Sequence, residues 1–137
     1  MNGANRYHST RIGIAIENIA GNFDLIGPTL ARHGERHGSD VVCVAEHRVR
    51  DPRHWIQMTK RIPAGWTAVT WEAATTSPAG HPCGGVAIFV NNQRVHALKL
   101  DLPQRCLADG RGRVCSARVR LHHVSQVPLV VVSWYLK

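Results

Sequence analysis

The spacing of hydrophobic residues along the first part of the chain predicts one strand followed by one helix. Across residues 11–18, isoleucines alternate with small or polar residues, as in a half-buried strand that ends at Asn18. Residues 23–30 then place apolar side chains at helical intervals. Because proline is tolerated only in the first turn of a helix, the regular helix is expected to span residues 28–37, with Gly38 ending it.

Apolar runs in the remainder of the chain predict six further strands. They are expected at residues 40–46, 67–71, 84–90, 95–100, 113–121 and 129–135. The runs at 40–46, 84–90 and 129–135 are nearly continuous, which is typical of strands buried on both faces. Residues 95–100 follow an Asn-Asn turn and are expected to pair with residues 84–90 as a hairpin.

The segments between these strands favour a short helix at residues 51–61 and loops at residues 75–82 and 102–112. An early helix followed by many strands indicates a mixed α/β (α+β) fold with a mostly antiparallel sheet. The chain has 137 residues, which suits one domain. We expect residues 1–10 to be a disordered tail and residues 11–137 to form the domain.

Composition excludes two broad classes of protein. Hydrophobic residues make up 44% of the chain and charged residues 19%, a balance that excludes an intrinsically disordered protein. No run of about 18 apolar residues is present, so no transmembrane helix is predicted. The N-terminal residues lack the apolar centre of a secretory signal. We therefore expect no membrane partner and an intracellular location, in the nucleus or the cytoplasm.

The charge of the chain favours a polyanionic partner. Lys and Arg number 17 against 9 Asp and Glu, for a net charge of +8. Most of these cations are arginine, whose guanidinium group binds phosphate oxygens in pairs, so nucleic acid is the simplest partner. A basic surface that only maintains solubility is the alternative. The candidate nucleic-acid-binding residues are Arg111, Arg113, Arg118 and Arg120, the last two on one face of a predicted strand.

Cysteine and histidine residues offer weaker metal-site signals. Cys43 lies within an apolar run and is expected to be a small buried hydrophobe. His81, Cys83, Cys106 and Cys115 could form a zinc site, although their spacing is loose and reduced thiols are the simpler interpretation.

Two histidine pairs complete this survey. His33 and His37 have a helical i, i+4 spacing, but the glutamate of a zinc-protease motif is displaced, which favours a polar helix end. His122 and His123 are expected to be surface residues, because neighbours on a strand point to opposite faces.

The order of four short motifs resembles the endonuclease/exonuclease/phosphatase superfamily. The first strand ends in Asn18-Ile19-Ala20-Gly21, the strand at 40–46 ends in Glu46, residues 84–90 read GGVAIFV, and the last strand reads VVVSWYLK. The match runs from about residue 11 to residue 137 and is similar to endonuclease domains of non-long-terminal-repeat retroelements. This resemblance to an exonuclease-III/DNase-I-like fold implies a four-layer β-sandwich with flanking helices.

The resemblance also implies a site and a function. Glu46 falls on the glutamate that binds Mg²⁺ (or Mn²⁺), Asn18 on the asparagine that helps orient the metal, and Tyr135 on the tyrosine that contacts the phosphate. The implied activity is metal-dependent phosphodiester cleavage in nucleic acid. A solvated acid at the end of a strand is the alternative interpretation of Glu46. A carboxylate at the end of a buried strand could hold Mg²⁺, with water completing its coordination.

Several positions depart from the family pattern. Ala45 replaces a glutamine, Glu17 an aromatic residue, Ser133 an asparagine and Lys137 a proline. The later G-D-x-N and S-D-H motifs, which supply the groups that activate water, have no counterpart. The chain is therefore expected to be the N-terminal half of such a domain, covering roughly one of its two sheets, and to be inactive as a fragment.

Two consequences and two alternatives follow from that expectation. An uncovered apolar sheet predicts self-association, or association with the absent C-terminal half. The main alternative is a non-catalytic basic nucleic-acid-binding or interaction module on the same fold. A lipid- or inositol-phosphate phosphatase is less well supported, because no residue pattern suggests recognition of an inositol ring.

Overall fold

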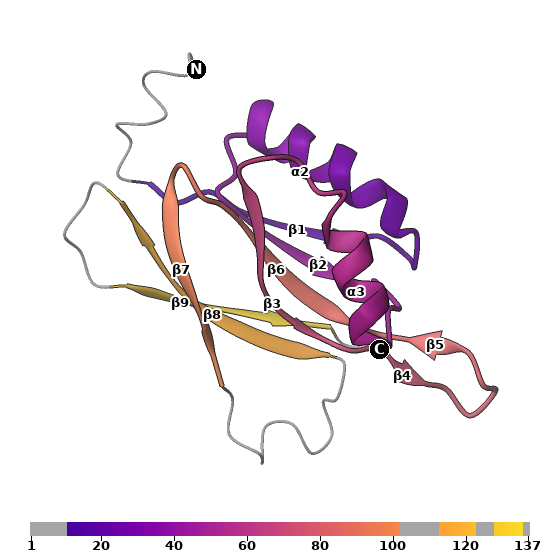
Figure 1. The fold of residues 1–137 in the computed structure, drawn as a ribbon. Helices are drawn as coiled ribbons and strands as arrows, with labels where there is room; N and C mark the ends of the chain where they lie inside the picture. The colour runs from indigo at the N-terminus through magenta and orange to yellow at the C-terminus, as the bar shows by residue number, and fades with distance from the viewer. Residues whose placement is uncertain (1–10, 102–112, 123–127, 136–137) are drawn as a thin grey trace.

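The computed structural model describes residues 11–101, 113–122 and 128–135 (Figure 1). The predicted mixed α+β fold is confirmed, with two helices and nine strands in these ranges. In chain order they are β1 (Ile14–Asn18), α2 (Ile26–Glu35), β2 (Val41–Ala45), α3 (Pro52–Thr59), β3 (Trp66–Glu72), β4 (Thr75–Thr76), β5 (Pro82–Cys83), β6 (Val86–Asn91), β7 (Val95–Leu100), β8 (Val114–Leu121) and β9 (Leu129–Trp134). A 3-10 turn at Phe23–Leu25 precedes α2.

The longer strands form two sheets. The four-stranded sheet has the order β1-β2-β6-β3, in which β1 and β2 are parallel and the other pairs antiparallel. The three-stranded sheet has the order β7-β8-β9 and is antiparallel throughout. β4 and β5 pair as a short separate ribbon. The sheets are therefore mixed and mostly antiparallel, as predicted.

The two sheets pack face to face, and the helices cover the other side of the four-stranded sheet (Figure 1). Between the sheets, alternate residues of β2 and β6 meet alternate residues of β8, including Ile88 and Val119, which are fully buried. On the helical side, Phe89 of β6 packs with Leu30 of α2 and Trp55 of α3. The expectation that the chain covers roughly one sheet is therefore wrong, because its strands supply two facing sheets.

The second sheet arises where the chain leaves β6. The predicted hairpin between residues 84–90 and 95–100 is wrong, since β7 pairs with β8. At this crossover the guanidinium group of Arg94 is buried, and its Nε donates to Asp40 Oδ1 at 3.1 Å. A second nitrogen of Arg94 donates to the carbonyl oxygen of Arg11 at 2.8 Å. This buried ion pair holds the crossover against the start of β2.

The helices begin where their local sequences allow. α2 starts two residues before Pro28, which leaves the proline in the first turn, where its missing N–H disturbs no helical hydrogen bond. The predicted helix at 51–61 is confirmed as α3, which begins with Pro52 and is capped by Asp51, whose side chain accepts from the Arg53 N–H at 2.9 Å.

β9 differs from its predicted burial on both faces. Its residues alternate, and Val130, Val132 and Trp134 are 60%, 52% and 65% exposed. Both helices lie on the far side of the four-stranded sheet from β9 (Figure 1), so neither can cover these side chains. Over the described part of the chain, no helix is long and apolar enough to cross a membrane.

Candidate functional site

Glu46 follows β2 directly and has an unusual backbone conformation. Its φ is +57°, a left-handed value that costs a non-glycine residue about 1–3 kcal/mol unless its surroundings impose it. The surroundings do so here: the Glu46 carbonyl oxygen accepts from the Gly21 N–H at 2.7 Å, and the next N–H, of His47, donates to the Gly85 carbonyl oxygen at 3.3 Å. Arg48 has the same left-handed φ of +57°. The chain therefore makes a tight, strained turn at the end of this strand.

The carboxylate of Glu46 is held by two protein donors. The hydroxyl of Tyr135 donates a hydrogen bond to Oε1, and Nη2 of Arg48 lies 3.3 Å from Oε2. The structure thus brings together Glu46 and Tyr135, which are 89 residues apart in the sequence. The hydrogen bond that Tyr135 donates to Glu46 raises the pKa of this tyrosine, with burial as a further cause. The hydroxyl therefore stays protonated at neutral pH and remains a donor.

These groups line a small pocket of about 140 Å³. Its lining residues are Glu46, Arg48, Pro82, Cys83, Gly84, Arg113 and Tyr135. The pocket thus combines a single carboxylate with two guanidinium groups. Arg113 is tied to Tyr135 through the backbone, because its carbonyl oxygen accepts from the Tyr135 N–H at 2.8 Å.

The buried side chain of His47 stabilises the strained turn through two hydrogen bonds to the backbone. The Nδ1 atom of His47 accepts from the Val49 N–H at 3.0 Å, so Nε2 carries the hydrogen and donates to the Glu72 carbonyl oxygen at 3.0 Å. Burial lowers the pKa of His47 to about 4, which keeps the ring neutral at physiological pH. A Cβ at Gly85 would lie 2.5 Å from this ring, so the second glycine of the GGVAIFV motif is required for the close approach.

Asn18 lies at the same edge of the sheet but does not line the pocket. It ends β1, and its register partner is Ala45, the residue before Glu46. Its side-chain oxygen accepts from the Ala20 N–H at 2.9 Å, which closes a local turn. The parallel pairing of β1 and β2 therefore places Asn18 beside the strand end that carries Glu46, as expected for two adjacent parallel strands.

The chemistry of these donors fits a weakly held Mg²⁺ or Mn²⁺. The two Glu46 oxygens offer about four lone-pair positions, of which Tyr135 and Arg48 engage two. Mg²⁺ commonly binds proteins through one or two carboxylates and retains several water ligands. Within residues 11–101, 113–122 and 128–135, no group of three or more His, Cys, Asp or Glu residues could enclose a metal ion. Tight structural binding is therefore not expected from the described part of the chain.

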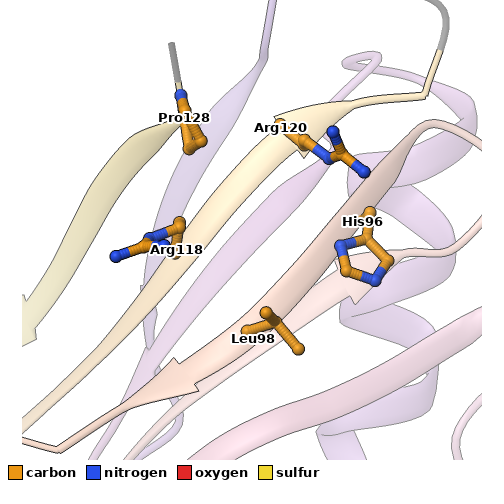
Figure 2. Close-up of a pocket in the computed structure, with 5 residues that line it drawn as sticks. All are labelled: His96, Leu98, Arg118, Arg120 and Pro128. Atoms are coloured by element: carbon orange, nitrogen blue, oxygen red, sulfur yellow. The ribbon is translucent and has the colours of Figure 1, made fainter.

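The predicted basic patch is divided between two places. Arg113 lines the Glu46 pocket, whereas Arg118 and Arg120 line a different pocket with His96 on the three-stranded sheet (Figure 2). Arg111 lies outside the described residues. The described arginines therefore line two separate pockets, and their binding of nucleic acid stays a prediction.

The described members of the zinc site considered above, His81, Cys83 and Cys115, do not form a group that could hold a metal ion. Cys43 is buried between the sheets, as predicted, and so is Cys115. Burial raises the pKa of both thiols. Cys83 instead lines the Glu46 pocket, with its sulfur 3.4 Å from the Thr75 hydroxyl, and Cys106 lies outside the described residues.

The histidines of α2 serve the packing of that helix. Nε2 of His33 lies 2.8 Å from Glu17 Oε1, and Arg32 donates to the same oxygen at 2.8 Å. Hydrogen bonding to His33 is the main cause that lowers the pKa of Glu17. Glu17, which departs from the family pattern, therefore joins β1 to the helix. His122 is exposed, as expected, and His123 lies outside the described residues.

Sequence reasoning missed Arg48, Cys83 and Gly84 as parts of the Glu46 pocket. Arg48 carried a weak signal, since a cation two residues after a strand-end acid can return to the same side after a tight turn. Gly84 opens the GGVAIFV motif, but that motif did not indicate a place beside Glu46, and Cys83 carried no signal, because the β4–β5 ribbon brings it there from a distant part of the sequence.

Comparison with known proteins gives little further information. No protein-family model matches the chain, and no curated protein matches it. One similar solved structure is that of the 3′ phosphatase NExo from Neisseria bound to product DNA hairpin, with 22% sequence identity and a TM-score of 0.46. The match covers 88% of this chain, which spans 40% of the length of that structure. A likeness of this size does not establish a family or an activity for the chain.

Proposed function

We propose that this chain forms the N-terminal part of a divalent-metal-dependent phosphodiesterase domain that acts on nucleic acid, similar to retroelement endonucleases. The observation that supports this most is the Glu46 pocket. A strand-end carboxylate is held in a strained turn by Tyr135 and Arg48, and a second guanidinium group, that of Arg113, lines the same small cavity. Strained backbone and opposed charges in one pocket are typical of functional sites.

Each residue of the pocket has a distinct part in this proposal. Arg48 and Arg113 donate hydrogen bonds to the oxygens of a bound phosphodiester, whose negative charge guanidinium groups match. Tyr135 holds the Glu46 carboxylate in a fixed orientation through its hydroxyl. Glu46 would hold Mg²⁺ or Mn²⁺, and Asn18 would support the metal from the adjacent strand end. When bound, such an ion neutralises charge on a phosphoryl oxygen.

We infer that the chain alone hydrolyses phosphodiesters slowly. The groups that the family resemblance assigns to water activation belong to motifs with no counterpart in this sequence. A general base typically contributes about 10²–10⁴-fold to a rate, and the groups of one active site act together, so the loss is larger still.

The metal part of the proposal is tested by titrating Mn²⁺ into the chain and following paramagnetic broadening of its NMR signals. We expect broadening centred on Glu46, Asn18 and Tyr135, with weak affinity. Glu46→Gln should abolish it, because the amide loses the charge that attracts the cation. Glu35→Gln, a matched change at an exposed helix end, should leave it unchanged. Broadening centred elsewhere, or persisting in Glu46→Gln, would contradict the proposal.

The activity part is tested by plasmid nicking in Mg²⁺. We expect no nicking above the level of Glu46→Ala, which controls for contaminating nuclease. Robust nicking that Glu46→Ala removes would support the phosphodiesterase assignment and overturn the inference that the chain is slow on its own.

A further inference from the structure

A second pocket lies on the outer face of the three-stranded sheet, apart from the Glu46 pocket. It has a volume of about 210 Å³ and is lined by His96, Leu98, Arg118, Arg120 and Pro128. Figure 2 shows His96 and Leu98 on one strand and the two arginines on its neighbour. None of these residues also lines the Glu46 pocket.

The register of the two strands concentrates positive charge there. His96 pairs directly with Arg120, and Leu98 pairs with Arg118. Arg118 and Arg120 lie two residues apart, so they share the outer face, and both are exposed. The two guanidinium groups carry like charges about 6.8 Å apart along one face of β8 and repel each other, and a bound anion would relieve this repulsion.

No carboxylate of the same sheet offsets this charge. The sequences of β7, β8 and β9 contain Lys99, Arg118 and Arg120 but no Asp or Glu. Among the described residues, the ion pairs all involve other arginines or His33, and none includes Arg118 or Arg120. The two guanidinium groups are therefore available to an external anion.

The geometry suits a chain of phosphates better than one small anion. Residues two apart on a strand are separated by about 6.8 Å along the strand, a distance on the scale of successive phosphates in an extended nucleic-acid strand. Each guanidinium group can bind two oxygens of one phosphate. The apolar side chain of Leu98 lies opposite Arg118 on the neighbouring strand and can contact sugar carbons.

We propose that this outer pocket binds the sugar-phosphate backbone of a nucleic-acid strand, with Arg118 and Arg120 contacting neighbouring phosphates and His96 beside them. The proposal rests on the proposed function and extends it: a substrate would be long enough to reach both the Glu46 pocket and this second surface. Binding here requires no metal, because the contacts are made by guanidinium groups.

The test measures binding of a fluorescent single-stranded oligothymidylate of about 20 nucleotides in EDTA at several salt concentrations. The variant is Arg118→Gln/Arg120→Gln. Its matched control is Arg36→Gln/Arg53→Gln, which removes the same charge from exposed positions at α2 and α3, behind the four-stranded sheet. Circular dichroism and thermal unfolding confirm that both variants fold.

We expect Arg118→Gln/Arg120→Gln to weaken binding about 20-fold near 0.1 M salt and to reduce the slope of log K against log salt by about 1.4, as for two lost single-strand phosphate contacts. Arg36→Gln/Arg53→Gln should change the affinity and the salt slope much less. Equal effects of the two variants would overturn the proposal, because the arginines would then contribute only net charge.

A second arm tests the chemical class of the ligand. Binding to phosphatidylserine vesicles that depends on Arg118 and Arg120, without binding to the oligonucleotide, would show a membrane-surface site and overturn the nucleic-acid assignment. The Mn²⁺ titration at Glu46 is independent of this experiment. If Mn²⁺ broadens the signals around Glu46 and Arg118→Gln/Arg120→Gln binds the oligonucleotide normally, only the outer-pocket proposal fails. If the double variant binds weakly and Mn²⁺ broadens no signal near Glu46, the outer-pocket proposal is supported and the metal site is refuted.

Discussion

The two sheets of this molecule differ in how many of their residues are buried. In the four-stranded sheet, all six residues of β6 are buried, and β2 is buried except at its last residue. In the three-stranded sheet, β8 is buried along its first four residues and at alternate positions after them, and β9 exposes Val130, Val132 and Trp134. The four-stranded sheet is covered by helices on one side and by a sheet on the other, whereas the three-stranded sheet exposes much of its outer face at Arg118 and Arg120 of β8 and along β9.

The charges differ in the same way. On the four-stranded side, Asp40 pairs with Arg94, and Glu17 pairs with Arg32 and His33. The three-stranded sheet contains cations and no acid. The comparison teaches that the stability of the fold should depend mainly on the four-stranded sheet, and that the three-stranded sheet is free to present its outer face to a partner.

The largest expected contrast is between two hydrophobic truncations. Phe89→Ala, in the fully buried β6, should lower the free energy of unfolding by about 3–5 kcal/mol through lost burial and a cavity beside Trp55. Leu98→Ala, at a 55% exposed position of β7, should change it by less than about 0.5 kcal/mol. Urea unfolding of the two variants and the parent chain measures both values. Similar losses would show that the two sheets contribute equally.

A smaller change in the free energy of unfolding is expected from pH, because the His47 ring is buried. Its pKa is lowered to about 4 in the folded chain, so between pH 6.5 and 4 the unfolded state binds a proton that the folded state does not. Stability should therefore fall as the pH falls through this range, by up to about 3 kcal/mol. Urea unfolding against pH measures the loss, and NMR titration of the His47 ring should give its midpoint near pH 4.

His37→Gln provides the control for that measurement, because His37 is exposed at the end of α2. It should leave the pH profile of stability unchanged. A His47 ring that titrates near pH 6.5 would contradict the description of a buried neutral imidazole.

The smallest expected effect on stability accompanies a change in association. An apolar groove of about 500 Å³ runs between β1 and β9, where Ile16 is 79% and Val132 is 52% exposed. Both strands end their sheets, and exposed apolar strands at a sheet edge favour pairing between molecules. We expect concentration-dependent self-association that Ile16→Lys/Val132→Lys reduces, with a stability change of about 0.5 kcal/mol or less per site.

Light scattering across a concentration series measures this association. A parent chain that stays monodisperse would contradict the prediction. The sequence suggested self-association because a second sheet was expected to be absent. In the structure the second sheet is present, and the exposed apolar surface lies instead at the sheet edges and on the outer face of β9.

Much of the fold could be predicted from local patterns. The continuous apolar runs at 40–46 and 84–90 predict buried strands because a strand covered on both faces has no polar side. The pairing of β7 could not be predicted in this way. Its partner β8 starts at Val114, beyond residues 102–112, and no local periodicity encodes that choice of partner. The predicted burial of β9 on both faces is wrong, because an apolar run does not itself supply the element that would cover its second face.

The candidate site likewise contains some residues that could be predicted from the sequence and others that could not. The resemblance to a family singled out Glu46, Asn18 and Tyr135, and the structure places the first and third in contact and the second at the adjacent strand end. Their roles remain predictions. The left-handed turn could not be predicted, because it follows from backbone hydrogen bonds of His47 and Arg48 to Gly85 and Gly84, which lie far away in the sequence, and Arg48 itself carried only a weak signal.

Three of the four tryptophans of this chain give it two separate optical reporters. Trp55 and Trp71 stack with ring centroids 4.6 Å apart and an angle of 8° between their planes, directly against the His47 ring. Stacked indoles held in a fixed orientation produce a near-ultraviolet circular dichroism signal that should disappear when the packing of Trp55 and Trp71 around His47 loosens. Trp134, on the outer face of β9, is open to a dissolved fluorescence quencher such as acrylamide. Spectroscopy can therefore follow the two sheets separately in the unmodified chain, without an added dye.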